Sequence, residues 1–321
     1  MRKFEKPRIV SSKCIEFESC RYNGLIIKSN MVKNLKKHAE FYPVCPEVEI
    51  GLGIPRDPVR IVGKEGKPQM IQPTTGKNLT KKMNEFSNSF LKHLDDVDGF
   101  ILKNRSPSCG IKNVKRYYGI KNTGSIRDGV GLFAQMVKEK FPDLPLEDEG
   151  RLRNLIIREN FLTRIFTLAE FRKIKESGTF NDLVEFQSRN KFLLLSYHQE
   201  HMRSMGRLLS NANKPLESIK KQYGKLLLQT LSGNPKITSN INVLMHFLGY
   251  FSGDLSTEEK SFFLENLQRY REGRIPLLVN LNLIKSWIIR FGEEYLDKQT
   301  FFQPYPKDMM QITFIYDKMD K

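Results

Sequence analysis

Long apolar runs are missing from this chain of 321 residues. No stretch approaches the roughly 20 apolar residues that a membrane-spanning helix needs. The opening residues, MRKFEKPRIV, also lack the long apolar core of a secretory signal peptide. The sequence therefore predicts a cytoplasmic protein with no membrane partner.

Cysteine is scarce, and its four copies are unevenly placed: Cys14, Cys20, Cys45 and Cys109 all lie in the first third of the chain. Structural disulfides are rare in a reducing cytosol, so clustered cysteines favour a metal, cluster or catalytic role. The spacing lacks the Cys-x-x-Cys pairs of a zinc ribbon. For any single cysteine, the alternative is a buried thiol that acts as a small apolar residue.

Acidic residues are too few to balance the basic ones. The chain has 53 lysines and arginines against 36 aspartates and glutamates, a formal net charge of +17. Such an excess favours a polyanionic partner, because basic side chains that neutralise phosphates gain affinity by releasing counterions. The alternative is a basic, soluble surface, and charge alone does not separate nucleic acid from a membrane surface.

An α/β domain is predicted over residues 1–150. Residues 8–12 and 99–103 have the apolar pattern of buried strands, and each leads into a polar loop that carries a cysteine. We expect helices over 29–40, 80–94 and 129–141 and a hairpin formed by 59–62 and 68–72. Because loops at the carboxyl ends of parallel strands meet at one edge of the sheet, we expect the cysteines to converge there.

The stretch 41–59, FYPVCPEVEIGLGIPRDPV, is predicted to be a shaped loop. Its four prolines and two glycines exclude one continuous helix, since each proline removes an amide donor and blocks the preceding turn. Glu47 follows Cys45 by two residues in this loop. A cysteine next to a carboxylate on a stiff backbone suggests a ligand or a nucleophile.

Helical patterns dominate the rest of the chain. Residues 151–187 are predicted to form a helical connector, residues 188–310 an all-helical bundle, and residues 311–321 a tail that includes the strand-like QITFIY. His198 and His201 lie three residues apart on a predicted helix. They suit a metal pair by spacing, but no third ligand is spaced nearby, so a structural or RNA-facing role is favoured.

Five short motifs follow one another in the first half. They are Ser12-Lys13-Cys14, Arg21-Tyr22-Asn23-Gly24, Val44-Cys45-Pro46-Glu47, Ser106-Pro107-Ser108-Cys109-Gly110 and the run EDEGRL from Glu147 to Leu152. In this order they resemble the thiouracil desulfidase family. The residues from about 188 to 310 resemble a helical domain of unknown function that is fused behind it in many relatives. Fused members resemble enzymes that remove sulfur from 4-thiouridine in tRNA.

The resemblance implies a [4Fe-4S] cluster held by Cys14, Cys45 and Cys109, with Cys20 outside the ligand set. Thiolates suit iron-sulfur iron, and three ligands leave one iron open to the soft sulfur of the substrate. Such an iron acts as a Lewis acid on the C–S bond while water attacks the ring carbon. The implied substrate is tRNA or a thiolated nucleotide.

The resemblance also suggests roles for nearby polar residues. Glu47 is the expected general base. Ser106, preferred over Ser108, is expected to orient the water or the carbonyl oxygen of the base, although ordinary turn chemistry explains either serine. Three arginines are expected either to bind a phosphate or the uracil edge, or to support the cysteine loops. They are Arg21, Arg56 and Arg105.

Three other functions stay open. One is a desulfidase that acts on free thiouracil or a thionucleotide. Another is a non-catalytic iron-sulfur protein that binds RNA or senses oxidants. The third is a hydrolase in which the three cysteines hold zinc.

Overall fold

The computed structural model of the chain describes residues 2–63, 68–94, 96–120, 123–210 and 214–310. They divide into two compact units. The first contains the described residues up to Ala169 and those from Tyr305 onward, and the second is Glu170–Pro304. The first unit is α/β and the second is helical, so the predicted fold class is confirmed.

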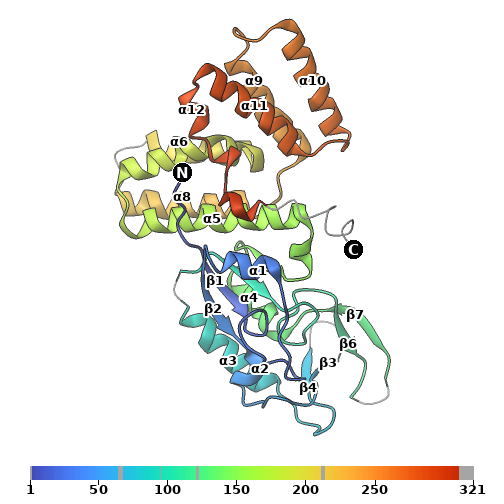
Figure 1. Cartoon of the computed structure of the whole chain (residues 1–321). Helices are drawn as coiled ribbons and strands as arrows, with labels where there is room; N and C mark the ends of the chain where they lie inside the picture. The colour runs from blue at the N-terminus through green and yellow to red at the C-terminus, as the bar shows by residue number, and fades with distance from the viewer. Residues whose placement is uncertain (1, 64–67, 95, 121–122, 211–213, 311–321) are drawn as a thin grey trace. The chain divides into compact units, whose positions relative to one another are not determined.

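A parallel sheet forms the centre of the first unit (Figure 1). Its strands are β1 (Arg8–Ser12), β2 (Glu40–Val44), β5 (Gly99–Leu102) and β8 (Leu146–Asp148), in the order β2-β1-β5-β8. Every pair in this sheet is parallel. The loops that follow the strands therefore leave from the same edge.

Both faces of this sheet are covered, as the alternation of side chains along a strand requires. Val10 and Phe100 pack in one apolar cluster with side chains of α3 (Thr80–Lys92) and α4 (Leu132–Lys140). The other face packs Ile9 and Ile101 against α1 (Asn30–Leu35) and the beginning of α5 (Leu155–Ser177). The predicted helices thus become the outer layers of an α/β sandwich.

A smaller mixed sheet lies beyond the parallel one. It contains β3 (Arg60–Val62), β4 (Gln69–Ile71), β6 (Val114–Tyr117) and β7 (Ser125–Gly129), in the order β4-β3-β6-β7. The antiparallel pairing of β3 with β4 confirms the predicted hairpin. The helix expected from residue 129 begins only at Leu132, because the residues up to Gly129 pair with β6.

The stretch that we expected to be a loop contains regular structure. Residues 40–44 are strand β2, and α2 (Pro46–Glu49) begins directly after Cys45. Pro43 is tolerated in this strand because β2 is the edge of its sheet. Pro46 is tolerated because it stands in the first turn of its helix, where its missing amide has no partner to lose.

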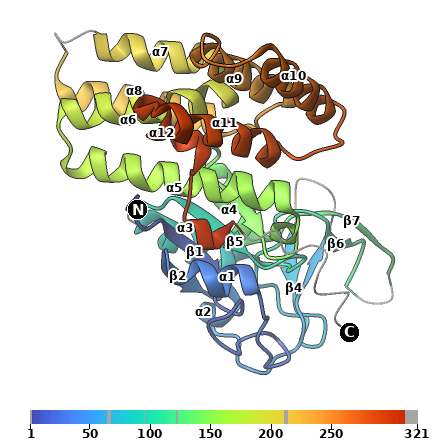
Figure 2. The ribbon, with the colours of Figure 1, turned by 45° about the horizontal axis from the view of Figure 1, so that its top comes forward.

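The second unit is built from helices that follow α5. They are α6 (Phe180–Tyr197), α7 (Gln199–Ser210), α8 (Leu216–Leu231), α9 (Ile237–Tyr250), α10 (Thr257–Arg271), α11 (Leu277–Phe291) and the short α12 (Glu294–Asp297). In Figure 2, α6, α7 and α8 lie side by side. Phe192, Phe247 and Trp287 belong to a core shared by α6, α9 and α11.

Two local features complete the helical unit. The helices α6 and α10 each begin with a capping box, the second made by Ser256 and Glu259 as its sequence suggests. Among the described residues, none of the helices combines the length and apolar character needed to cross a bilayer. The expected strand QITFIY lies outside the described residues.

Candidate functional site

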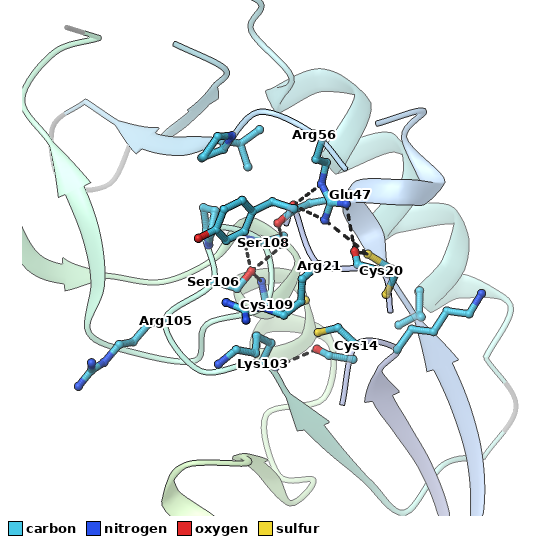
Figure 3. Close-up of a pocket in the computed structure, with 18 of the residues that line it drawn as sticks. Cys14, Cys20, Arg21, Glu47, Arg56, Lys103, Arg105, Ser106, Ser108 and Cys109 are labelled. Atoms are coloured by element: carbon cyan, nitrogen blue, oxygen red, sulfur yellow. Dashed lines mark hydrogen bonds and ion pairs between the residues drawn. The ribbon is translucent and has the colours of Figure 1, made fainter. Parts of the chain in front are cut away.

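A cavity of about 500 Å³ opens at the carboxyl edge of the parallel sheet (Figure 3). Residues that follow β1, β2 and β5 line it, so its walls come from three separate loops. Its volume lies in the range of pockets that hold a small molecule or one base. The pocket contains all four cysteines of the chain: Cys14, Cys20, Cys45 and Cys109.

The strands deliver three of these cysteines separately. Cys14 lies two residues after β1, Cys45 follows β2 directly, and Cys109 lies in the loop after β5. Each side chain is less than a tenth exposed. The structure therefore brings together residues that are far apart in the sequence. It also places Cys20, which was expected to stand outside the ligand set, on the wall of the same pocket.

The surroundings of three of these thiols favour the neutral form when no metal is bound. Burial raises the pKa of Cys109 to about 12. A hydrogen bond with Cys14 raises the pKa of Cys20 to about 11. The neighbouring Cys20 thiol, followed by burial, also raises the pKa of Cys45. A bound cation reverses this balance, because a thiol that coordinates a metal gives up its proton.

The donor set fits an iron-sulfur cluster better than a single ion. Within the described part of the chain, no three Cys, His, Asp or Glu side chains are grouped closely enough to hold one metal ion. A four-iron cluster is much larger than one ion and spreads its ligands farther apart. Thiols on three separate loops around a cavity suit the larger group, and soft sulfur is the ligand that iron-sulfur clusters use.

Glu47 lies at the centre of a polar network on the pocket wall (Figure 3). Its Oε2 accepts hydrogen bonds from Arg56 Nε at 2.9 Å and Nη2 at 2.7 Å. Its Oε1 accepts one from Ser108 Oγ at 2.6 Å. The side chains of Arg56 and Glu47 are only 6% and 11% exposed, so the ion pair is screened little by solvent. The network fixes the carboxylate of Glu47 on the wall of the cavity.

Arg56 also ties the cysteine loops together. Its Nη1 donates to the carbonyl oxygen of Cys20 at 3.0 Å and to that of Gly53 at 3.2 Å. Its Nη2 lies 3.9 Å from Cys45 Sγ. The backbone amide of Arg56 donates to the carbonyl of Tyr22 at 2.8 Å. Of the two roles considered for this arginine, these contacts favour support of the loops.

Ser106 and Ser108 have different surroundings although their hydroxyls are 2.9 Å apart. Ser106 Oγ accepts hydrogen bonds from the amides of Ser108 at 3.2 Å and Cys109 at 3.1 Å. This is ordinary turn capping, and it shapes the loop around the cysteine. Ser108 alone contacts Glu47. The serine that contacts Glu47 is therefore Ser108 and not Ser106, the serine that we preferred from the sequence.

The other two candidate arginines also line the pocket. The guanidinium of Arg21 lies 5.6 Å from the ring centroid of Tyr22, and this tyrosine, on the pocket wall, is 43% exposed. Arg105 is exposed and has a positive φ of 57°, which non-glycine residues rarely adopt. Both guanidinium groups are available to an anionic substrate, in contrast to that of Arg56.

Sequence reasoning missed Lys103 and Glu149. The Nζ of Lys103, a pocket residue, donates to Glu149 Oε1 at 2.5 Å. Glu149 Oε2 accepts the amide hydrogen of Asn104 at 2.8 Å. Two of the sheet's loops, after β5 and after β8, are joined in this way. The signal was present in the EDEG run, but its partner is separated from it by more than forty residues.

Within the described part of the chain, no third Cys, His, Asp or Glu side chain joins His198 and His201 in a group that could hold a metal ion. Their rings stack with centroids 3.8 Å apart, and His198 Nδ1 accepts the amide hydrogen of His201 at 3.2 Å. Burial, and then the neighbouring His198, lower the pKa of His201. The pair therefore joins the end of α6 to the beginning of α7, which agrees with the structural role.

Comparison with known proteins identifies both parts of the chain. Residues 9–149 match the family model for 2-thiouracil desulfurase, and residues 191–306 match DUF1722, a protein family of unknown function. The uncharacterized protein YbgA of Escherichia coli is 30% identical over 152 residues, which are 46% of this chain and 90% of YbgA. The chain belongs to the family of YbgA. It joins a 2-thiouracil desulfurase domain to a DUF1722 domain, so the predicted fusion is confirmed.

Two further similarities involve less than half of the chain. The uncharacterized protein YbbK of Bacillus subtilis is 29% identical over 140 residues, which are 41% of this chain and 89% of YbbK. Among solved structures, the [4Fe-4S]-dependent thiouracil desulfidase TudS is 25% identical and aligns with a TM-score of 0.37. That alignment covers 46% of this chain and 94% of TudS.

Proposed function

We propose that this protein is a non-redox, [4Fe-4S]-dependent desulfidase that replaces the sulfur of 4-thiouridine in tRNA with oxygen. The observation that carries the proposal is the pocket in which cysteines from three strand ends surround a buried carboxylate. The match of residues 9–149 to the 2-thiouracil desulfurase family supports the same chemistry.

Cys14, Cys45 and Cys109 are the residues proposed to hold the cluster. Held by these three thiolates, a cluster would supply a soft Lewis acid for the sulfur of a thiocarbonyl. The protein's own contribution is a pocket whose wall includes the buried side chains of Glu47 and Ser108. Four iron atoms, and not one zinc ion, suit the spread of the three thiols around the cavity.

Glu47 is the proposed general base. A water molecule next to its carboxylate loses a proton to Glu47 as its oxygen bonds to the ring carbon that carries sulfur. The C–S bond then breaks, sulfur leaves with its bonding electrons as sulfide, and both protons of the water, the first of them returned by Glu47, leave with the sulfide as hydrogen sulfide. One water is consumed, a uridine residue and sulfide are formed, and no external electron is needed.

Arg56 and Ser108 hold the carboxylate of Glu47 in position for this role. Arg56 fixes one carboxylate oxygen, so the other faces Ser108 and the cavity. The hydroxyl of Ser108 is positioned to donate its hydrogen bond either to Glu47 or to the attacking water. Arg21 and Arg105 on the pocket wall provide positive charge for the substrate's phosphates.

An RNA substrate is favoured over a free base by charge. The net charge of +17 exceeds what a neutral thiouracil needs, and each phosphate neutralised by Lys or Arg adds affinity through counterion release. The arginines at the pocket wall suit a substrate with a phosphate backbone. A free thionucleotide is the closest alternative, because it presents a phosphate to the same pocket.

Three substrates tested side by side separate these possibilities. Anaerobically reconstituted protein is given thiolated tRNA, 4-thiouridine monophosphate and free 4-thiouracil, and released sulfide is measured. Release from tRNA with a higher kcat/KM than from the nucleotide is the expected result. Equal or better turnover of the nucleotide would reject RNA as the substrate, and no release from any of them would reject the desulfidase function.

A further inference from the structure

The strands β6 and β7, within the described residues 111–120 and 123–129, form an arm that the reaction described above does not use (Figure 1). The sequence from residue 111 to residue 129 contains five basic residues and one acidic residue. The acidic one, Asp128, accepts a hydrogen bond from Arg116 Nε at 3.0 Å, and this contact lowers the pKa of Asp128. Its charge is therefore neutralised within the arm, which keeps an excess of cations.

Lys115 and Arg127 expose part of this excess positive charge to solvent. Both side chains are exposed, and within the described residues neither forms an ion pair. A solvated strand edge with scattered charges is a common device against aggregation. In this arm, however, the cations accompany exposed rings and apolar side chains: Tyr118 is 65% exposed and Ile126 is 43% exposed.

The arm is fixed to the loop that carries Cys109. Gly131, just after the arm, donates its amide hydrogen to the carbonyl of Gly110 at 2.8 Å, and Leu132 donates to that of Pro107 at 3.1 Å. A side chain at Gly131 would place its Cβ 2.5 Å from the backbone of Ser108. Both ends of the arm are thus bound to the wall of the pocket, and its direction is set by the cysteine loop.

We propose that this arm binds the RNA strand beside the thiolated base, and the inference rests on the desulfidase function proposed above. Lys115 and Arg127 contact phosphates, while Tyr118 stacks on an unpaired base. Proteins that bind single-stranded segments combine these two contacts, a basic track for the backbone and an exposed aromatic side chain for the bases.

Charge opposes a second copy of this chain as the partner. The strand β7 is the edge of its sheet, and an open edge can pair with a strand from a second molecule. Pairing two copies of this arm brings together like charges, which opposes association. A single RNA strand instead matches both features, because its phosphates suit the excess of cations and its bases suit the exposed ring.

The test compares two variants that remove the same charge. The arm variant is Lys115→Gln with Arg127→Gln and Tyr118→Ser, and the control is Lys82→Gln with Lys92→Gln on the exposed side of α3. Binding of unmodified tRNA is measured at several salt concentrations. We expect the arm variant to bind at least tenfold more weakly, with a salt slope reduced by about 1 to 2. The control should bind like the wild type.

Turnover of 4-thiouridine monophosphate serves as the check on folding. We expect the arm variant to keep it while losing turnover of thiolated tRNA. Unchanged tRNA binding in the arm variant would overturn the proposal, as would equal losses with nucleotide and tRNA. Loss of self-association with unchanged tRNA binding would assign the arm to a second copy instead. Because binding needs no catalysis, absence of sulfide release would reject the function and leave this test intact.

Discussion

The hydroxyl of Ser108 donates a hydrogen bond of 2.6 Å to the carboxylate of Glu47, although the two residues are 61 positions apart in the chain. Each lies next to a cysteine-bearing segment, Glu47 two residues after Cys45 and Ser108 directly before Cys109. The bond therefore connects the two polar groups proposed for catalysis, and each of them lies beside a proposed cluster ligand in the sequence. A buried network that is fully satisfied holds its members in one arrangement.

Replacing Glu47 tests the proposed base. Glu47→Gln keeps the shape of the side chain but removes the group that accepts a proton, so sulfide release should fall about 100- to 10,000-fold. Single-turnover assays on reconstituted protein measure the loss, and iron content shows whether the cluster is retained. Glu49→Gln, on the same short helix but exposed, is the matched control. Activity in Glu47→Gln equal to that of the control would exclude Glu47 as the base.

Replacing Ser106 and replacing Ser108 should have different effects in the same assay. Ser108→Ala removes a direct partner of Glu47 and should lower kcat at unchanged iron content. Ser106→Ala removes the acceptor for two loop amides, which should cost about 1 kcal/mol of stability and reduce iron retention around Cys109. The reverse pattern, with slow chemistry in Ser106→Ala alone, would transfer the catalytic role to Ser106.

Arg56 should contribute more to the stability of the fold than to catalysis. Arg56→Gln leaves the nearly buried carboxylate of Glu47 without its ionic partner, and breaking such a pair costs about 3 kcal/mol. Urea denaturation followed by circular dichroism measures the change, with the exposed Arg153→Gln as a control expected to stay within about 0.5 kcal/mol of the wild type. Equal stability of the two variants would remove Arg56 as the support of the loops.

Cys20 provides a test of the ligand set. All four cysteines line the pocket, so position alone does not choose three of them. If Cys14, Cys45 and Cys109 are the ligands, Cys20→Ala should retain iron and lose about 1 kcal/mol of stability from the fully buried position. Alanine at any of the other three should strongly reduce the iron bound after reconstitution. A loss of iron in Cys20→Ala as large as in the others would make Cys20 a ligand.

Much of the site follows from the sequence because it depends on strand ends. The apolar pattern of the sequence predicts the two strands before Cys14 and Cys109, and the loops that follow parallel strands lie at one edge of the sheet. The third strand was missed, since Pro43 argues against a strand unless that strand lies at the edge of its sheet. The convergence of the cysteines was thus predicted, while the element that delivers Cys45 was not.

Side-chain partners across loops were harder to predict. Arg56 reaches Glu47 only because the intervening turn folds back, with Gly51 at a φ of 88°. Lys103 meets Glu149 through the pairing of β5 with β8, which no local pattern shows. Such contacts depend on the register of distant strands, so they appear only once the fold is built.

Sulfide release by anaerobically reconstituted protein, compared between the wild type and Cys109→Ala, tests the central claim most directly. Thiolated tRNA is the substrate, and iron content is measured on the same samples. The account predicts that the wild type binds about four irons and releases sulfide, and that the variant does neither. Equal sulfide release from Cys109→Ala, or from wild-type protein that holds zinc and no iron, would contradict it.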